Sequence, residues 1–556
     1  MKAMKCLFLS CILLSYRTCT AEILEVPGRY AAIQDAILAA ADSDTVIVSP
    51  GTYRENIDSR GKSLTLRSTD PSDPSIVAST VIDGGQAGPV ITLNEVASAT
   101  IAGLTIRSGY SQSERGAGIV CLNSNATITG NIIEGNRCAV QGGAISCTYS
   151  AAIISGNRIT ANEAPSAAGI FLMKSAADVS ANTIADNTSA GGMTAIMAAD
   201  SSGNIHGNTI AGNESGETGG LPPLGLLDCS FDVAENVITQ NNGGGVYVSC
   251  STYSRTAIVR SNAIVNNFGV FAKGLYLVGP KGSAFIIGNT IVGNESSHNS
   301  AIKCRESNPV IAGNVVVGNR SESGAAVLRA HKSNVCLVGN TFCANMSRPD
   351  VSVIRFEGGY SSVVNCVFRG NKREDIKVEP YLGDEGKATV SHSIARATSP
   401  GGGLIFGPGN IDADPLFVDP GHWDDAGTPS DPSDDTFIPG DYHLLPGSPC
   451  IDAGTNDVDN PDTPEIETLP PTDISGLPRV IDGDLDGTAT VDIGAYEYLP
   501  GDVNYDGKVN VLDLLLVRNS IGRDPASSVD ARNADVNADG AVNVDDLLAV
   551  RGRLGR

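Results

Sequence analysis

Two short runs near the C-terminus place oxygen-bearing side chains at the spacing that a hard cation requires. In each run, aspartate or asparagine occupies positions 1, 3, 5, 9 and 12, and glycine at position 6 permits the sharp turn of a calcium loop. The predicted ligands are Asp502, Asn504, Asp506, Asn510 and Asp513 in the first loop and Asp535, Asn537, Asp539, Asn543 and Asp546 in the second. The sequence therefore predicts two calcium ions within residues 501–556.

A second group of reactive side chains lies between residues 247 and 379. Residues 251–400 carry 17 basic and ten acidic residues, a net charge of +7, in a chain whose net charge is −24. The candidates are Tyr247, Tyr276 and Lys377 for substrate binding and Lys303, Arg305, Arg355, Glu357 and Glu379 for catalysis. Because tyrosine rings stack on sugars while cations pair with carboxylates or sulfates, this group suits an anionic glycan.

Two reactions fit these residues, and the sequence leaves both open. A lyase must neutralise a uronate carboxylate, remove the proton at C5 and expel the linked oxygen. Arg305 or Arg355 would neutralise the carboxylate, and Lys303 would be the base if cationic neighbours lower its pKa. A hydrolase needs paired carboxylates, and Glu357 and Glu379 on adjacent strands would be roughly 5 Å apart at the backbone, which suits a retaining pair. A third interpretation is solvated ion pairs, such as Arg355 with Glu357.

An internal repeat must position these residues. A phrase of the form GNTIAGN recurs ten times, and successive copies are 25 to 28 residues apart. Its first asparagine falls at residues 131, 157, 182, 208, 236, 262, 289, 314, 340 and 365. Each period contains three short β-branched runs and no amphipathic helix. This pattern predicts a mainly β fold, a right-handed parallel β-helix with three strands per coil, whose asparagines stack in one column and satisfy each other's amides.

With this repeat, residues 24–395 resemble the right-handed β-helix superfamily that includes the pectate lyases. The resemblance implies a substrate site on the outer face of one sheet. We expect that sheet about twelve residues after each ladder asparagine, with alternate residues facing inward. This phase directs Cys121, Cys147 and Cys304 into the core as free thiols and the tyrosines and cations outward, with Leu328 interrupting the cations. The sequence lacks the paired aspartates and Gly-His-Gly of polygalacturonases.

The N-terminal region is expected to combine an export signal with a cap. A charged start, a short apolar run and a small-residue cleavage site predict a signal peptide over residues 1–21. A helix then follows, with Ile33, Ile37 and Leu38 on one face. Such a helix would cover the open end of the β-helix, which we assign to residues 22–395.

Residues 396–498 lose the repeat and are strongly acidic. Between residues 401 and 500 there are 21 acidic residues and one basic residue. The runs NIDADPLFVDP, GDYHLLPGSPCIDAG and VDIGAYEY resemble the C-terminal segment of many secreted bacterial β-helix proteins, which implies that this segment closes the β-helix. The carboxylates of DGDLDG, residues 482–487, either bind calcium or belong to a solvated acidic loop.

Residues 499–556, which contain both calcium loops, closely resemble a type I dockerin. Aspartate replaces the glutamate usual at position 12, no helix precedes either loop, and an amphipathic helix follows each one. The resemblance implies a small all-α domain that folds with calcium and docks onto a cohesin. The contact positions late in the loops are Val511-Leu512 and Val544-Asp545, where clostridial dockerins often carry hydroxyl residues.

Composition excludes several other classes of protein. Strong local acidity without a basic arm argues against a nucleic acid partner. After the predicted signal peptide, no segment is long and apolar enough to span a membrane. The chain has 13 cysteines, and the ten that would remain after cleavage are too sparse for a disulfide scaffold.

These features favour a secreted enzyme, a polysaccharide lyase or glycoside hydrolase, that acts on an anionic polysaccharide. Its dockerin would carry it to an extracellular complex or the cell surface. The alternative is a non-catalytic glycan-binding or structural β-helix with the same docking module. The dockerin favours the enzyme, because the usual cargo of dockerins degrades polysaccharide, whereas the lack of a complete catalytic motif favours the alternative.

Overall fold

The computed structural model describes residues 21–555 apart from short gaps. The residues left out between these ends are 114, 217–219, 253–254, 270–273, 280–282, 298–300, 324, 326, 348–351, 372–374, 382, 396–402, 429–433 and 459–468. Except for Ala21, the predicted signal peptide lies outside the described residues.

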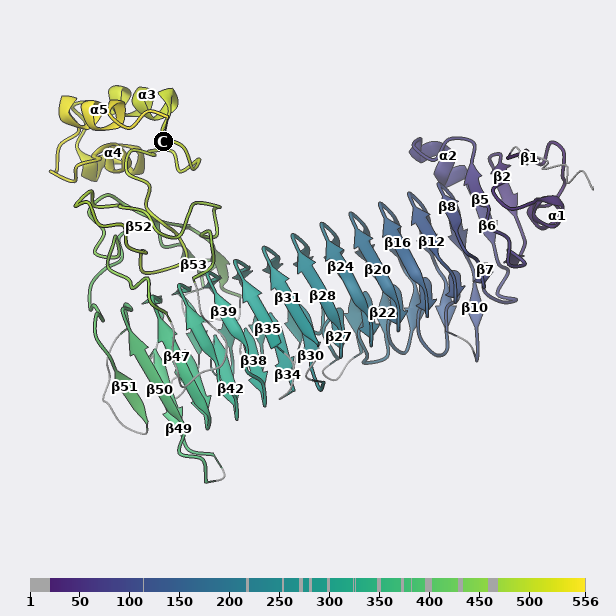
Figure 1. Ribbon diagram of the computed structural model, residues 1–556, viewed down its shortest axis with the longest axis horizontal. Helices are drawn as coiled ribbons and strands as arrows, with labels where there is room; N and C mark the ends of the chain where they lie inside the picture. Colours follow the sequence, from purple (N-terminus) through teal and green to yellow (C-terminus); the bar gives the residue numbers. More distant parts are fainter. Residues whose placement is uncertain are drawn as a thin grey trace, which may run out of the picture.

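Three long parallel sheets run along the molecule and form a parallel β-helix, as predicted (Figure 1). Sheet 1 has 16 strands, from β1 (Ile23–Val26) to β51 (Leu404–Phe406), and sheet 2 has 13 strands, from β3 (Gly51–Tyr53) to β48 (Val367–Arg369). Sheet 3 also has 13 strands. They are β4 (Ile57–Asp58), β7 (Ile91–Asn94), β11 (Ile119–Leu122), β15 (Ile145–Thr148), β19 (Ile170–Met173), β23 (Ile196–Ala199), β27 (Leu224–Leu227), β30 (Val246–Ser249), β34 (Leu275–Val278), β38 (Ile302–Arg305), β42 (Leu328–His331), β46 (Ile354–Glu357) and β49 (Ile376–Glu379).

Strand alternation builds the core. Ile145 and Ile170 are paired in register on neighbouring strands of sheet 3 and are fully buried. Cys121, Cys147 and Cys304 also face inward from this sheet and are buried thiols without a disulfide, as the strand phase predicted. Identical or similar side chains therefore stack from coil to coil, and each coil buries the apolar face of the next.

A column of asparagines joins successive coils at the turn between sheets 1 and 2. From Asn131 to Asn314, each residue of the column donates its backbone N–H and its side-chain amide to the Oδ1 of the asparagine one coil further on, at 2.8–3.0 Å, and Asn340 is the last acceptor. Asn208 and Asn314 share this column, which confirms the predicted register. Buried turn polar groups are thus satisfied without water.

The tenth predicted ladder residue, Asn365, lies outside the column. Cys366 takes its position, and the backbone N–H of Asn340 points to the Cys366 Sγ at 3.5 Å. Asn365 occupies the preceding turn position with a φ of 55°, in the left-handed region that asparagine tolerates better than most residues. Its amide exchanges two hydrogen bonds of 2.9 Å with the backbone of Thr455.

A second asparagine column, which the sequence analysis did not identify, follows sheet 2. Its backbone N–H groups donate to the next Oδ1 at 2.9–3.1 Å. The members are Asn136, Asn162, Asn187, Asn213, Asn241, Asn267, Asn294, Asn319, Asn345 and Asn371. The last asparagine of each repeated phrase therefore has the same structural role as the first.

Helix α1 (Ile33–Ala39) packs against the first strands of the β-helix. Ile33 and Ile37 are buried, as predicted, but Leu38 is 56% exposed. The buried stripe continues through Ala36 and Ala40, which follow Ile33 at the helical spacing of three and seven residues, and Leu38 is turned away from it. A second short helix, α2 (Pro74–Ser79), lies in the next coils.

The acidic segment covers the outer face of sheet 2 in the last coils. Phe417, Phe437 and Tyr442 form one apolar cluster with Val315 and Val367 of that sheet. The segment contains two antiparallel pairs, β52 (Phe417–Asp419) with β55 (Asp441–Leu444) and β53 (His422–Asp424) with β54 (Thr436–Ile438). Strand β51 still pairs in parallel with β50 (Lys387–Ser391), so the parallel ladder runs past residue 395, where the sequence placed its end.

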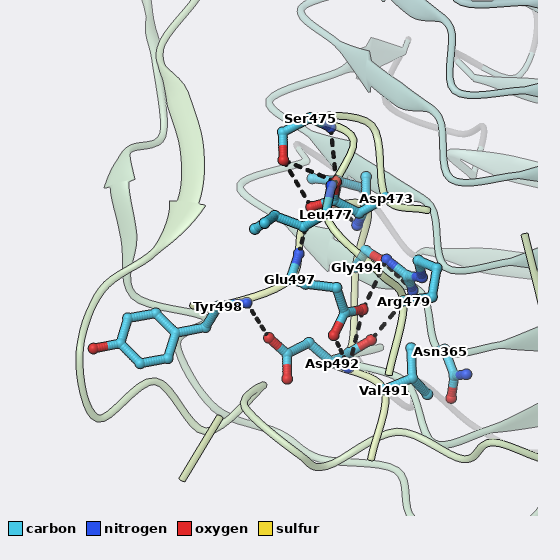
Figure 2. A network of polar contacts seen from close by, with 12 residues as sticks. Asn365, Asp473, Ser475, Leu477, Arg479, Val491, Asp492, Gly494, Glu497 and Tyr498 are labelled. Atoms are coloured by element: carbon cyan, nitrogen blue, oxygen red, sulfur yellow. Dashed lines mark hydrogen bonds and ion pairs between the residues drawn. The ribbon is translucent and has the colours of Figure 1, made fainter. Parts of the chain in front are cut away.

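A buried polar network fixes this segment (Figure 2). Arg479, the single basic residue between residues 401 and 500, contacts the Glu497 carboxylate at 3.0 Å and donates to the Gly494 carbonyl at 3.1 Å. Asp492 accepts the N–H of Tyr498 at 2.6 Å. Burial is the main cause that raises the pKa of both Asp492 and Glu497. One guanidinium is thus enclosed with more carboxyl groups than it can neutralise, which favours a retained proton.

The C-terminal domain is all-α, as predicted. It contains α3 (Val511–Ser520), a short 3₁₀ helix (Pro525–Ser527), α4 (Val529–Ala534) and α5 (Val544–Arg551) around a small valine-rich core. The short helix α4 directly precedes the second loop, so the expectation that no helix precedes either loop was wrong for that loop. The domain lies against the acidic segment (Figure 1). At this contact the Tyr505 hydroxyl donates to the Leu444 carbonyl at 3.2 Å, and the Tyr505 ring stacks on His443 at 4.7 Å between centroids. Within the described residues, no helix combines the length and apolarity needed to cross a membrane.

Candidate functional site

The outward positions of sheet 3 form one row across six adjacent strands. Register pairing gives the order Tyr247, Tyr276, Lys303, Arg329, Arg355 and Lys377. We call the last four residues the cationic row. The structure brings all the predicted substrate-binding and catalytic residues to this face of sheet 3, including Arg305, Glu357 and Glu379, which stand two positions further along their strands.

The sequence predicted that Leu328 interrupts the row of cations, and this prediction was wrong. It faces the core and is fully buried, and Arg329 takes the outward position. Val327 occupies the buried turn position that Ala301 and Val353 hold in the neighbouring coils. The expected register was therefore displaced by one residue in this coil, and a one-residue shift exchanges the two faces of a strand.

Tyr247, Tyr276 and Lys303 contact one another along the row. The two tyrosine rings meet edge to face, 5.3 Å apart between centroids, and the Lys303 Nζ lies 5.0 Å from the centre of the Tyr276 ring. Burial is the main cause that lowers the pKa of Lys303, and the positive charges of Arg329 and Arg305 lower it further. These effects favour the neutral amine of Lys303, the form that can accept a proton, more than in an exposed lysine.

Glu357 is the buried anion beneath the cationic row. It is 4% exposed, and its carboxylate lies 3.0 Å from Arg329, 3.0 Å from Arg355 and 3.2 Å from the Nδ1 of His331. The ring of His331 also meets Tyr381 edge to face at 4.1 Å. Glu357 thus orients the basic side chains. The Arg355–Glu357 ion pair that one interpretation of the sequence suggested is present, but its carboxylate is buried and not solvated.

Glu379 is also paired with cations. It accepts from Arg355 at 2.8 Å and contacts the Lys377 Nζ at 2.7 Å. Burial acts to raise its pKa, but the hydrogen bonds from Lys377 and Arg355 outweigh burial and hold the pKa below its usual value. A carboxyl group with this pKa is a poor general acid at neutral pH. The two carboxylates do face each other across neighbouring strands, as expected.

The sequence did not reveal Arg329 or Tyr381, and it favoured His331 as a surface residue, whereas His331 contacts the buried Glu357. The run Leu328 to His331 alternates apolar and polar residues, and this alternation alone would have placed Arg329 and His331 outward. Tyr381 lies beyond the last strand of sheet 3, and no periodic signal in the sequence connects it to His331.

The first C-terminal loop gathers its carboxylates around a tight turn. Asp502 accepts the N–H of Gly507 at 2.8 Å, and the N–H of Asp506 points to Asn504 Oδ1 at 3.1 Å. The position-12 residue, Asp513, is fully buried and accepts the N–H of Asn510 at 2.8 Å.

The second loop repeats this arrangement. Asp535 accepts the N–H of Gly540 at 3.0 Å, and the buried Asp546 accepts the N–H of Asn543 at 2.8 Å. Asn537 Oδ1 accepts the N–H of Asp539 at 3.0 Å. Asp502, Asn504 and Asp513 of the first loop therefore accept the same backbone hydrogen bonds as Asp535, Asn537 and Asp546 of the second.

The electrostatics of both loops fit a hard cation. Burial is the main cause that raises the pKa of Asp502 to about 6, and repulsion from Asp513 adds to it. Burial and then the charge of Asp546 raise the pKa of Asp535 in the same way. Carboxylates that repel one another in a partly buried loop are the oxygen donors that calcium selects. Calcium would supply the positive charge that this donor set lacks.

Asn510 and Asn543 have a second role as helix caps. Asn510 Oδ1 accepts the N–H of Leu512 at 2.8 Å, and Asn543 Oδ1 accepts the N–H of Asp545 at 2.7 Å. Each cap fixes the start of the helix that follows its loop. Their contribution as position-9 ligands stays a prediction.

A third acidic group combines Asp452 with two residues of the DGDLDG run. One oxygen from each of Asp452, Asp482 and Asp484 lies within 4.8 Å of the others. Asp452 also accepts the backbone N–H of Asp484 at 2.6 Å, and Asp482 accepts that of Gly487 at 3.2 Å. These backbone contacts agree with an ordered acidic loop, with or without calcium.

Comparison with known proteins gives two family matches. The family described as "Dockerin type I domain" matches residues 500–555, and the family described as "Right handed beta helix region" matches residues 65–219 and 117–291. No curated protein matches the chain. The crystal structure of pectate lyase Pel9A aligns with 86% of this chain and 97% of its own at 13% sequence identity and a TM-score of 0.30, values too low to add to the strand topology.

Proposed function

Because the chain is a right-handed parallel β-helix that ends in a type I dockerin domain, we propose that it acts on an anionic polysaccharide outside the cell, in a complex held by a cohesin. The observation that carries this proposal is the row on sheet 3, where two tyrosines are followed by four cations in register. One charge per strand, about 4.8 Å apart, suits a polymer with regularly repeated anionic groups.

The charge balance of this face favours an acidic ligand. The cationic row and Arg305 together exceed the two carboxylates, Glu357 and Glu379, that pair with them. This positive face belongs to a chain whose net charge is −24, so an anionic polymer would be directed to it and repelled elsewhere. Tyr247 and Tyr276 would add stacking contacts with the sugar rings.

Of the two reactions, β-elimination has the better support. Lys303 would take the proton from C5 of a uronate, the electron pair would form the C4–C5 double bond, and the C4–oxygen bond would break, with the leaving oxygen protonated by solvent. Arg305 and Arg329 would neutralise the uronate carboxylate and so make the C5 proton more acidic. Hydrolysis is less favoured, because Glu357 and Glu379 are each held by basic side chains.

Non-catalytic glycan binding is the second candidate. It is favoured by the contacts of Arg355, whose guanidinium is already shared by Glu357 and Glu379. Such a network keeps the charged side chains in fixed positions, which suits binding, but Arg355 is then less free to pair with the carboxylate of a reacting substrate.

The dockerin supports calcium binding and a protein partner. We propose two calcium ions, one in each loop, because the two donor sets are equivalent. Val511, Leu512, Val544 and Leu548 are each more than half exposed at the start of α3 and in α5. An exposed apolar set on a small domain is typical of a protein-binding surface, and we infer that a cohesin covers it. The predicted signal peptide at residues 1–21 is consistent with export.

Incubation of the purified protein with polygalacturonate, alginate and sulfated glycans tests the catalytic proposal. We expect unsaturated uronates, detected by ultraviolet absorbance, from at least one uronate polymer. Lys303→Ala should abolish this product while retaining binding, and Arg329→Ala should weaken binding about tenfold. The matched control is Arg158→Ala, a paired and exposed arginine on sheet 2, which should change neither.

The outcomes separate the two candidates. Salt-sensitive binding without any cleavage product would support the non-catalytic candidate. New reducing ends without unsaturation would favour hydrolysis and contradict Lys303 as the base. If Arg329→Ala and Lys377→Ala bind every anionic glycan as well as the parent does, the cationic row is not a glycan site.

A further inference from the structure

We propose that a pocket at the seam between the β-helix and the acidic segment binds a neutral sugar residue. The pocket has a volume of about 250 Å³. Phe268 and Glu295 line it from the β-helix, and Trp423, Asp435 and Thr436 line it from the hairpin of β53 and β54. It is separate from the cationic row, and it does not depend on the catalytic proposal above.

The β-helix side of this seam pocket is built by short corner strands between sheets 2 and 3. Strands β33 (Phe268–Gly269), β37 (Glu295–Ser296) and β41 (Arg320–Ser321) pair in register, so Phe268, Glu295 and Arg320 are neighbours in one row. Phe268 is 49% exposed, which is unusual for a large apolar ring in a chain with only 5% aromatic residues. The Glu295 carboxylate is bound to the Arg320 guanidinium. The corner therefore presents a ring face beside a neutralised ion pair.

The hairpin side is held firmly in place. The indole Nε1 of Trp423 donates to the Ala344 carbonyl at 2.9 Å, and the Arg320 guanidinium lies 5.7 Å from the centre of the Trp423 ring. Phe437, opposite Trp423 in the hairpin, lies directly on Gly318, where an added Cβ would come within 2.0 Å of the ring. These contacts fix the hairpin side of the seam pocket against the β-helix.

The groups around the seam pocket match a neutral pyranose. The aromatic rings of Phe268 and Trp423, which line the pocket, suit the C–H groups of a sugar, whereas the carboxylates of Glu295 and Asp435 and the hydroxyl of Thr436 suit its hydroxyl groups. Arg320 neutralises Glu295, so Asp435 leaves a negative balance that would repel a uronate. The volume admits a single sugar ring and not an extended chain.

The seam pocket lies in the same coils as the outward row of sheet 3. Strand β33 immediately precedes β34, which carries Tyr276, and β37 immediately precedes β38, which carries Lys303. A neutral sugar in the pocket could be a branch of a polymer that also contacts sheet 3, or a unit of a separate neutral glycan. The recognition chemistry is the same in both cases.

Trp423 makes the test direct, because it is the only tryptophan in the sequence. The fluorescence of the full-length protein is titrated with methyl glycosides of glucose, galactose, mannose, xylose and rhamnose, and with methyl galacturonoside. We expect a saturable change with at least one neutral sugar at a Kd of about 1 mM, and none with the uronate. If none of the neutral sugars changes the emission at about 50 mM, the proposal is overturned.

Variants distinguish this pocket from the cationic row. Phe268→Ala and Asp435→Ala should each weaken neutral-sugar binding about tenfold. Tyr149→Ala removes an exposed ring from another part of the β-helix and should leave it unchanged, as should Lys303→Ala with Arg329→Ala. Retained affinity in both pocket variants, with their fold verified by circular dichroism, would contradict the assignment. A branched acidic polymer that loses affinity with Phe268→Ala identifies a branch as the ligand, and an unchanged affinity identifies a separate neutral glycan.

Discussion

Glu357 places one buried negative charge beneath three basic side chains, and this arrangement predicts how the row responds to its loss. In Glu357→Gln, Arg329 would lose the carboxylate that it pairs with, and Arg355 would keep only Glu379. Because both arginines are partly exposed, we expect a destabilisation of about 2 kcal/mol, below the full cost of breaking a buried pair. Urea denaturation measures this change.

The matched control for this substitution is Glu163→Gln. Glu163 pairs with Arg137 on an exposed corner, and its replacement should change the free energy of unfolding by about 0.5 kcal/mol or less. Equal effects in the two variants would mean that Glu357 does not orient the cationic row.

The buried carboxyl group of Glu497 leads us to expect, also at the residue scale, that the free energy of unfolding depends on pH. Burial raises its pKa, so the folded chain holds this proton more tightly than the unfolded chain does. The resulting stabilisation is fully present below the unfolded-state pKa of about 4.3 and is lost as the pH rises toward the folded-state value. Glu497→Gln cannot ionise, so it should match the parent in thermal unfolding near about pH 4 and exceed it at about pH 8. A stability difference that does not grow with pH would contradict a protonated Glu497.

At the scale of elements, the asparagine column stabilises the β-helix through hydrogen bonds between neighbouring coils. Asn208→Leu removes the acceptor for the backbone and amide of Asn182 and the donor to Asn236, and each lost partner leaves a buried polar group unsatisfied. We expect a loss of about 3 kcal/mol in the free energy of unfolding. Asn204→Leu makes the same change on the exposed face of β24 (Ser202–His206) and should cost about 0.5 kcal/mol or less. The column is not a main source of stability if both variants unfold alike.

The same elements show which features the sequence could predict. The spacing of the asparagines predicted the three sheets and the inward side chains, because every coil must hydrogen-bond to its neighbour in register. It did not predict Arg329, because corner turns outside the ladder vary in length without breaking that register. Asn365 was misassigned for another reason: asparagine suits both the stacked position and the left-handed position before it, so residue type alone does not separate them. Glu357 contacts Arg329 and His331, which lie on the coil whose register was displaced by one residue, so these contacts could not be predicted from the sequence either.

At the scale of the whole molecule, the acidic segment connects the β-helix to the dockerin. Its aromatic residues pack on sheet 2, Asn365 of the β-helix binds Thr455, and Tyr505 of the first calcium loop stacks on His443. Tyr505 stands between two predicted calcium ligands, Asn504 and Asp506. We therefore expect a change in this loop to reach the segment through Tyr505.

Removal of calcium tests this connection. Without a cation, the clustered carboxylates of each loop repel one another, so a chelator should abolish hydrogen-exchange protection in α3 and α5. Because Tyr505 then loses its fixed position, exchange in residues 441–445 should become about tenfold faster, while that of β15 should not change. In Tyr505→Ala, chelation should affect the dockerin alone, since the contacts with His443 and Leu444 are already absent. If chelation leaves residues 441–445 of the parent fully protected, the calcium loop and the acidic segment are independent; if it leaves α3 and α5 protected, the loops do not need calcium to fold.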